Sequence, residues 1–276
     1  MLQDITSRER RRGRSVGLVP TMGALHAGHM SLIKRARAEN DIVVVSIFVN
    51  PAQFAAGEDF NKYPRDLASD AGMIQDKADY LFAPEAWALY PSGYNTWVYV
   101  EGLSEGKLCG RFRPGHFKGV ATIVLKLFNI IQPDRAYFGL KDYQQSVIIR
   151  KMASDLDLSV DIVLCPTIRE PDGLAMSSRN AYLAPEEREA ARALYEALQA
   201  GAGLVRSGAG PEKAKTEMQK ILSSRPLISE IQYASVYNPE TLEELSAIEK
   251  TPVLLAGAIR IGNTRLIDNV LVNELK

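Results

Sequence analysis

Two histidines, His26 and His29, lie three residues apart within residues 20–29 (PTMGALHAGH). A short apolar run at residues 16–19 precedes them, and apolar positions at helical spacing follow from Met30 to Asn40. This pattern predicts a strand, a loop and a helix, whose free backbone N–H groups and positive dipole end attract phosphate. Imidazole N–H groups placed there donate hydrogen bonds to phosphate oxygens. Phosphate chemistry is therefore indicated, with two locally satisfied loop histidines as the alternative.

The nearby residues do not favour a metal site. No cysteine and no third histidine lies close to His26 and His29, which makes them a poor zinc set. The two cysteines, Cys109 and Cys165, are far apart and form no C-x-x-C pattern, so neither a disulfide framework nor a zinc site is expected. We expect no metal ligands in the protein.

Composition limits the class of protein. The 276 residues are 46% hydrophobic and 24% charged, which is typical of a globular protein. Lysine plus arginine and aspartate plus glutamate both number 33, so a global nucleic-acid-binding surface is not implied. The local basic run at residues 8–14 is interrupted by Glu9, and we interpret it as the polar face of a first helix. No apolar stretch reaches membrane-spanning length and no signal peptide is evident, so we expect a cytoplasmic protein that does not contact a membrane.

Three predicted strands end in polar segments. The first precedes the histidine loop; the second, at residues 41–49, runs into residues 50–54, and the third, at residues 135–138, runs into residues 139–145. Ligands of open α/β sheets bind at the carboxyl ends of the strands. We therefore expect these three segments to lie at one rim of the sheet.

The alternation of strands and helices predicts the fold class: α/β, with a doubly wound, mostly parallel, Rossmann-like sheet. Further strands are expected at residues 79–82, 96–101 and 160–164, and a helix after Pro64 with Leu67, Ala71 and Ile74 buried. Beyond Arg169 two helical patterns, at about 186–207 and 211–223, are followed by strand patterns without βαβ alternation. The prediction is a larger domain at residues 1–167 and a smaller C-terminal α+β domain at residues 168–276.

Several other polar residues fit a phosphate or carboxylate ligand, each with a plainer alternative. Lys141 is a plausible point charge for phosphate or a solvated surface lysine. Residues 177–179 (SSR) form a donor-rich loop or a helix cap. Gln53 and Gln145 carry neutral amides that both donate and accept, which suits a carboxylate that must stay nucleophilic. Residues 113–118 either close over a site or only pack as a loop. Other nucleotide and hydrolase motifs, such as the P-loop and G-x-S-x-G, are missing.

The H-A-G-H pattern resembles the His-x-Gly-His signature of adenylyl-transferring enzymes, which include the class I aminoacyl-tRNA synthetases. With the other segments assembled, the sequence closely resembles the pantothenate synthetase (pantoate–β-alanine ligase) family over nearly the whole chain. The matching segments, in family order, are residues 19–26 and 28–29 (VPTMGALH, GH), 46–51 and 53–54 (SIFVNP, QF), 63–65 (YPR), 113–117 (RPGHF), 126–129 (KLFN), 138–139, 141–142 and 144–145 (FG, KD, QQ), 173–180 (GLAMSSRN) and 265–269 (RLIDN). Leu140 stands where many members of the family carry glutamate. A role of its backbone in nucleotide binding would not be affected by this difference in side chain.

The resemblance implies a reaction and its participants. The family uses ATP to condense (R)-pantoate with β-alanine through a pantoyl adenylate, which gives pantothenate, AMP and pyrophosphate in pantothenate and coenzyme A biosynthesis. By this resemblance the chain would be an AMP-forming ligase that creates a C–N (amide) bond. Mg²⁺ would accompany the phosphates, and the partners would be the small-molecule substrates and a second copy in a homodimer. The first domain would bind nucleotide and pantoate, with the second as a lid.

The resemblance also implies roles for individual residues. His29 matches the position named as proton donor, and His26 and Lys141 complete the implied catalytic set. Gln53 and Gln145 match the positions that bind pantoate, and Gln53 would also border β-alanine. The implied ATP-binding residues are Met22, Gly23, Ala24, Leu25, His26, Ala27, Gly28, His29, Gly139, Leu140, Lys141, Asp142, Ile168, Met176, Ser177, Ser178 and Arg179.

Three rival functions use the same features. A nucleotidyltransferase acting on a phosphate ester would need extra basic residues, and Gln53 with Gln145 argues against it. A tRNA synthetase is disfavoured by the neutral net charge and the lack of an anticodon-binding extension. A non-catalytic nucleotide sensor would not need His26, His29 and Lys141 intact.

Overall fold

The computed structural model describes residues 2–55 and 57–274, and this chain divides into two compact units. Unit 1 contains residues 2–55, 57–106, 113–140 and 145–166, and unit 2 contains residues 107–112, 141–144 and 167–274. The predicted boundary at residue 168 stays a prediction.

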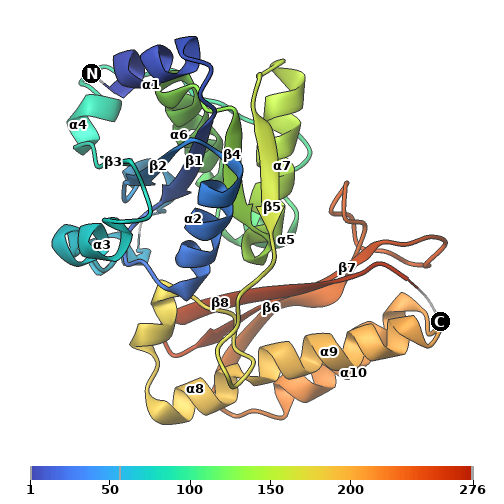
Figure 1. Cartoon of the computed structure of the whole chain (residues 1–276). Helices are drawn as coiled ribbons and strands as arrows, with labels where there is room; N and C mark the ends of the chain where they lie inside the picture. The colour runs from blue at the N-terminus through green and yellow to red at the C-terminus, as the bar shows by residue number, and fades with distance from the viewer. Residues whose placement is uncertain (1, 56, 275–276) are drawn as a thin grey trace. The chain divides into compact units, whose positions relative to one another are not determined.

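Unit 1 is built on a five-stranded parallel sheet (Figure 1). Its strands are β1 (Val16–Thr21), β2 (Ile42–Ile47), β3 (Tyr80–Phe82), β4 (Arg135–Gly139) and β5 (Asp161–Cys165). They lie in the order β3-β2-β1-β4-β5. The chain thus adds β2 and then β3 on one side of β1, and it adds β4 and then β5 on the other side. The predicted doubly wound α/β fold with a smaller α+β part is confirmed.

Helices cover both faces of this sheet, which explains why its central strands are continuous apolar runs. The helices of unit 1 are α1 (Leu2–Arg11), α2 (Ala27–Glu39), α3 (Leu67–Ile74), α4 (Ala86–Leu89), α6 (His116–Ile131) and α7 (Tyr143–Asp155), whose first two residues group with unit 2. On one face Val19, Val43 and Val45 pack in a cluster with Ile33 of α2 and Ile74 of α3. The intervening residues of the strands lie on the other face, as the two-residue period of a strand requires.

β1 and β4 mark the point where the strand order reverses. β1 pairs with β2 along its whole length, but its pairing with β4 joins only Gly17 to Arg135 and Leu18 to Ala136. The carboxyl halves of these two neighbours are therefore not paired with each other. Open sheets bind ligands at such a switch point. The histidine loop follows β1 at this switch point, and β4 ends at Gly139 beside it.

Two sequence predictions for unit 1 were wrong. Residues 96–101 form no strand, although Val98 N–H donates to Thr122 Oγ1 of α6 at 2.9 Å. In α3, Ile74 is buried at 3% exposure as expected, but Leu67 is 48% exposed and Asp70 is 4% exposed, so the aspartate takes the inward position that the apolar pattern assigned to Leu67. The aspartate is buried because its carboxylate accepts hydrogen bonds from the backbone of residues 24 and 25.

Unit 2 consists of an antiparallel sheet with helices packed against it. The strands β6 (Ile228–Tyr237), β7 (Val253–Ile261) and β8 (Thr264–Val272) lie in that order, and α9 (Ala193–Arg206) and α10 (Pro211–Ser223) cover them. α8 (Pro185–Ala191) ends at Arg192, so the single helix expected at 186–207 is two. The short helix α5 (Leu108–Phe112) also belongs to this unit.

The core of unit 2 is formed by apolar residues shared between helices and sheet, among them Leu194, Leu198, Met218, Leu255 and Ile259. None of the helices within residues 2–55 and 57–274 combines the length and the apolar character that spanning a bilayer needs.

Gly119 of α6 provides a test of the packing in unit 1. A Cβ atom at this position would lie 2.3 Å from the backbone oxygen of Ala52, in the 3-10 helix η1 (Pro51–Gln53). Because a backbone carbonyl cannot rotate away, we predict that Gly119→Ala lowers the free energy of unfolding by about 1–3 kcal/mol. Urea denaturation measures this change.

The matched control is Gly72→Ala in α3, where no atom lies within 4 Å of the position that the added methyl group would take. There the substitution should leave stability unchanged or raise it by up to about 1 kcal/mol, because alanine favours helix. Equal effects at the two glycines would contradict this account of the α6–η1 contact.

Candidate active site

The two histidines of unit 1 cap the first turn of α2 together. His26 is the N-cap residue, and its Nδ1 accepts a hydrogen bond from Gly28 N–H at 3.1 Å. His29 Nδ1 accepts from His26 N–H at 3.3 Å, which closes a reciprocal capping box. Because Nδ1 is the acceptor in both rings, the proton of each neutral imidazole is on Nε2. The ring centroids lie 4.1 Å apart, so two Nε2–H donors stand at the positive end of a helix.

A buried carboxylate holds the loop before this helix. Asp70 of α3 accepts from Ala24 N–H at 2.9 Å and from Leu25 N–H at 2.8 Å, one bond to each oxygen. Gly23 has a φ of +82°, and a Cβ there would lie 2.9 Å from the same carboxylate. Glycine is therefore required for both the backbone angle and the close approach. Asp70 fixes the position from which His26 and His29 emerge.

Gln53 lies in a buried network of neutral polar groups. Its Oε1 accepts from Asn50 Nδ2 at 3.1 Å, and its Nε2 contacts Met22 Sδ at 3.1 Å. Asn50 Nδ2 also donates to Gly119 O, and Asn50 Oδ1 accepts from the hydroxyl of Tyr90 at 2.9 Å. Burial raises the pKa of Tyr90, so this hydroxyl stays protonated and donates. A thioether is a weak acceptor, so a ligand oxygen can replace Met22 as the partner of the Gln53 amide.

Charged residues support Gln53 through its backbone. His116 Nδ1 lies 2.8 Å from Gln53 O and its Nε2 lies 2.9 Å from Arg113 Nη1, so His116 donates to the carbonyl and accepts from the guanidinium. Arg113 in turn forms a two-pronged ion pair with Glu58, at 2.6 and 2.7 Å. The segment at 113–118, for which closure and packing were both open, therefore packs beneath Gln53.

Other predicted site residues of unit 1 lie after β4. Gly139 ends that strand and Leu140 begins the next turn. Gln145 is half-buried in the first turns of α7, and its amide bonds to no other residue of the described chain. Its amide is therefore available to a ligand.

In unit 2 the backbone of Lys141 is held by the C-terminal sheet. Asn269 Nδ2 donates to Lys141 O at 2.9 Å, and Lys141 Nζ lies 3.7 Å from Asp142. The residue before Asn269, Asp268, forms a two-pronged pair with Arg169 at 2.6 and 3.0 Å. Burial raises the pKa of Asp268, and the charge and hydrogen bonds of Arg169 oppose that rise. These contacts give a structural role to residues 265–269, for which the sequence indicated none.

The loop at residues 168–179 of unit 2 folds back on itself. Met176 N–H donates to Ile168 O at 3.0 Å, and Gly173 has a φ of +90° at the turn. Ser177 caps the short helix η4 (Ser178–Tyr182) by accepting from Arg179 N–H at 3.3 Å. A donor-rich loop and a helix cap, the two interpretations of residues 177–179, are thus compatible.

The described residues contain no group of three or more histidine, cysteine, aspartate or glutamate side chains that could hold a metal ion. Their donor set consists instead of N–H groups, hydroxyls, amides and cations. These residues fit an anionic ligand and do not fit a metal bound by the protein alone.

Sequence reasoning identified the residues whose side chains emerge at the strand ends, but it missed the residues that position them. Asp70 and Asn50 hold loops in unit 1, and Asp268 and Asn269 hold backbone in unit 2. The one available signal was an aspartate four residues before a buried Ile74 on the same helix face.

Known proteins resemble the chain over nearly its whole length. A sequence model of the family described as Pantoate-beta-alanine ligase matches residues 1–271. A relative named pantothenate synthetase, from Thermodesulfovibrio yellowstonii, is 58% identical over 273 residues, which are 99% of this chain and 97% of the relative.

Solved structures agree with this match. The crystal structure of pantothenate synthetase from Thermus thermophilus has a TM-score of 0.90 at 45% identity and covers 96% of both chains. The structure of pantoate-beta-alanine ligase from Francisella tularensis, complexed with beta-gamma ATP and beta-alanine, has a TM-score of 0.77 at 35% identity. It covers 98% of this chain and 95% of that one.

The two Asp70 hydrogen bonds lead to a prediction about the loop that carries His26 and His29. Asp70→Ala should lower the free energy of unfolding by about 2–4 kcal/mol, because two partly or fully buried N–H groups lose a charged acceptor. Urea denaturation is the measurement. Asp76→Ala, an exposed aspartate just after the same helix, should change stability by less than about 0.5 kcal/mol. A small effect at Asp70 would show that the loop holds its position without the carboxylate.

Proposed function

The chain belongs to the pantoate–β-alanine ligase family, and from this membership we propose how its residues carry out the reaction. The enzyme is a ligase that joins pantoate to β-alanine through an amide bond to form pantothenate. We propose that ATP drives this ligation through a pantoyl adenylate. The observation that carries the proposal is the pair of capped histidines at the amino end of α2, where a helix dipole and two Nε2–H donors suit polyphosphate.

In the first step an oxygen of the pantoate carboxylate attacks the α-phosphorus of ATP. One P–O bond forms, the bond to the bridging oxygen breaks, and pyrophosphate leaves with the electron pair. Negative charge grows on the leaving group, and fixed donors stabilise it without reorganising. We propose that His26 and His29 supply such donors from unit 1, and that Lys141 supplies a cation from unit 2.

The remaining ATP contacts are proposed on the same basis, each unit contributing its own residues. The backbone N–H groups of residues 24–26 and 28 already donate within unit 1, so the histidine loop is proposed to contact ATP through its imidazole rings and through close backbone approach at its glycines. The proposed ATP-binding residues are Met22 to His29, Gly139 and Leu140 in unit 1, and Lys141, Asp142, Ile168, Met176, Ser177, Ser178 and Arg179 in unit 2.

Pantoate is proposed to bind the amides of Gln53 and Gln145. A nucleophilic carboxylate must keep a lone pair available, and a neutral amide binds hydroxyl and carboxylate oxygens without the two-pronged grip of a guanidinium. The buried charge nearest to Gln53, Arg113, is already paired with Glu58 and lies beneath the backbone. This arrangement supports recognition by amide hydrogen bonds.

In the second step the amine of β-alanine attacks the acyl carbon of the adenylate. The C–N bond forms, the C–O bond to AMP breaks, and the amine loses a proton. The complex of the Francisella tularensis relative with beta-gamma ATP and beta-alanine supports ATP and β-alanine as ligands of this chain. Mg²⁺ is proposed to enter with the phosphates of ATP, whose charge it neutralises, because the described side chains gather no metal-ligand group.

Two further proposals concern the setting of the enzyme. Both cysteines are buried and free, which suits the reducing cytoplasm. Exposed aromatic residues of unit 1, with Trp87 at 73% and Tyr99 at 46% exposure, support a homodimer because such surface is often covered by a partner. Sedimentation equilibrium of the whole chain at micromolar concentration would disprove the dimer if only monomer were found.

The test of the reaction is ATP–pyrophosphate exchange with Mg²⁺, measured without β-alanine. Exchange should require pantoate, because the first step is reversible only when the acyl adenylate forms. Ser229→Ala, at an exposed serine of β6, is a matched control that should exchange at the wild-type rate. His29→Ala should slow exchange by about 100-fold or more, the usual effect of losing a donor to developing charge. Exchange without pantoate, or none at all, would contradict the proposed adenylate.

The support of Gln53 by His116 predicts a change in one Michaelis constant. His116→Ala removes the ring that donates to Gln53 O, so the KM for pantoate should rise about tenfold while the KM for ATP changes little. Steady-state kinetics with each substrate varied in turn measures the split. Lys118→Ala, on the same helix but placed over Trp97, should change neither constant. A parallel rise in both constants would mean that His116 only maintains the fold.

A further inference from the structure

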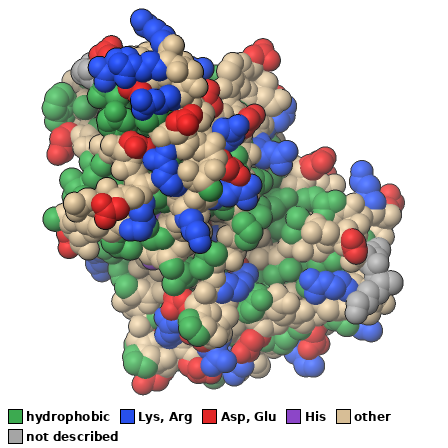
Figure 2. All heavy atoms as spheres, viewed as in Figure 1, with side chains coloured by type: hydrophobic (Ala, Val, Ile, Leu, Met, Phe, Trp, Pro, Cys, Tyr) green, Lys and Arg blue, Asp and Glu red, His purple; other side chains and the backbone are tan. Residues whose placement is uncertain are grey.

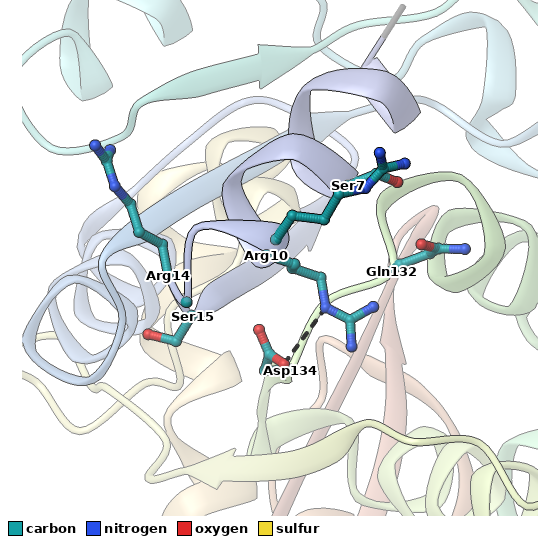
Figure 3. Close-up of a pocket in the computed structure, with 8 residues that line it drawn as sticks. Ser7, Arg10, Arg14, Ser15, Gln132 and Asp134 are labelled. Atoms are coloured by element: carbon teal, nitrogen blue, oxygen red, sulfur yellow. Dashed lines mark ion pairs between the residues drawn. The ribbon is translucent and has the colours of Figure 1, made fainter.

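A pocket of about 630 Å³ opens in unit 1 at the edge of the sheet opposite the histidine loop (Figure 3). Its lining comes from the last turns of α1, the segment leading into β1, and the link between α6 and β4. The lining residues are Ser7, Arg10, Arg11, Gly13, Arg14, Ser15, Gln132 and Asp134. Because β1 is six residues long, this pocket lies about 20 Å from the loop that follows the strand.

The lining is positively charged. It contains three arginines and one aspartate, which gives a net charge of +2. Asp134 serves the sheet, because its Oδ2 accepts from Val16 N–H at 2.7 Å, and Arg10 Nε lies 3.7 Å from its Oδ1. Lysine and arginine side chains gather over α1 at the top of Figure 2. The Asp134 carboxylate thus holds the start of β1, and its single negative charge does not neutralise the three arginines of the lining.

The arginines near α1 fall into two groups. Arg8, Arg12 and Arg14 lie within 3.2–3.7 Å of the buried carboxylate of Glu9, which accounts for them as support for the helix. Arg10 has only the longer contact with Asp134, and Arg11 makes no ion pair with the described residues. Of the three arginines that line the pocket, Arg14 is thus held by Glu9, whereas Arg10 and Arg11 remain available for an external anion.

Neutral donors complete the lining. Gln132 follows α6 as its C-cap in a left-handed conformation with a φ of +49°, and it contributes an amide to the lining. Ser7 contributes a hydroxyl from α1. Guanidinium, amide and hydroxyl groups together are the donors that bind phosphate oxygens.

We propose that this pocket binds a small phosphorylated molecule of about mononucleotide size. The volume lies within the range of about 300–1,000 Å³ that small-molecule sites occupy. A phosphate monoester carries a charge of about −1.5 to −2 at neutral pH, which Arg10 and Arg11 can pair with because neither is held by Glu9. The site is separate from the proposed ATP-binding residues and does not depend on their assignment.

The proposal is tested by isothermal titration of the whole chain with AMP and, separately, with pyrophosphate and inorganic phosphate. Wild-type protein should bind a phosphorylated probe at one site in addition to any site that needs His29. Arg11→Gln should weaken the additional binding about tenfold or more, as expected for loss of a charged hydrogen bond, and should leave turnover unchanged. Stronger binding of AMP than of inorganic phosphate would assign the site to a nucleotide, and the reverse order to free phosphate.

Arg12→Gln is the matched control, because it removes the same charge from the end of the same helix without lining the pocket. It should leave the additional binding intact. The proposal is wrong if no probe binds beyond the site that needs His29, or if Arg12→Gln weakens the additional binding as much as Arg11→Gln does. It is also wrong if less than one heparin molecule per protein chain is enough to displace the probe. This last result would identify a polyanion surface in place of a discrete pocket.

Discussion

The hydrogen bonds from the loop after β1 to the Asp70 carboxylate are the constraint on which the candidate site of unit 1 depends. The N–H groups of residues 24 and 25 hold the loop by donating to this carboxylate, so the donors offered to a ligand must come from elsewhere in the loop. Here the backbone at residues 24 and 25 is fixed from behind by a side chain of α3, and Gly23 accepts the backbone angle that this needs. The following N–H groups are then fixed by the histidines, so the same rings both cap α2 and offer donors through Nε2. A carboxylate-fixed, imidazole-capped helix start is pre-organised before any ligand arrives.

A second principle is the separation of charge from the proposed pantoate contact. The Gln53 side chain forms its polar contacts with the neutral groups of Asn50 and Met22, whereas the guanidinium of Arg113 reaches the backbone oxygen. Glu58 neutralises that guanidinium in a two-pronged pair. A cation aimed directly at a bound carboxylate would strengthen binding but withdraw the lone pairs that must attack phosphorus. Rigid amides supported by a neutralised ion pair give orientation without that loss.

The sequence was sufficient for the five strands of the parallel sheet and for the loop that carries His26 and His29, because apolar periodicity and the H-A-G-H spacing are local signals. It was insufficient wherever a residue acts through a distant partner. Asp70 was hidden because an apolar stripe was expected at its position, yet the loop 45 residues earlier makes the carboxylate the buried group. Arg169 and Asp268 are 99 residues apart, and no local pattern pairs them. Residues 96–101 show the opposite failure, because their composition predicted a strand that does not form. Their backbone donates to the hydroxyl of Thr122 on a helix, whereas a strand needs a neighbouring strand as its hydrogen-bond partner.

The switch point also accounts for the difference between the two edges of the sheet. β1 and β4 pair at Gly17 and Leu18, near their amino ends, and no longer pair beyond them. At the amino edge Asp134 spans the two strands by accepting from Val16 N–H, so that edge is closed by the backbone. Because the backbone at this edge is already hydrogen-bonded, an anion can bind only at the surface. The proposed place is the shallow pocket between α1 and the α6–β4 link, which Arg10 and Arg11 line. At the carboxyl edge β1 runs into the loop that carries His26 and His29, and β4 ends at Gly139. The proposed reaction site and the basic pocket therefore lie at opposite ends of the same two strands.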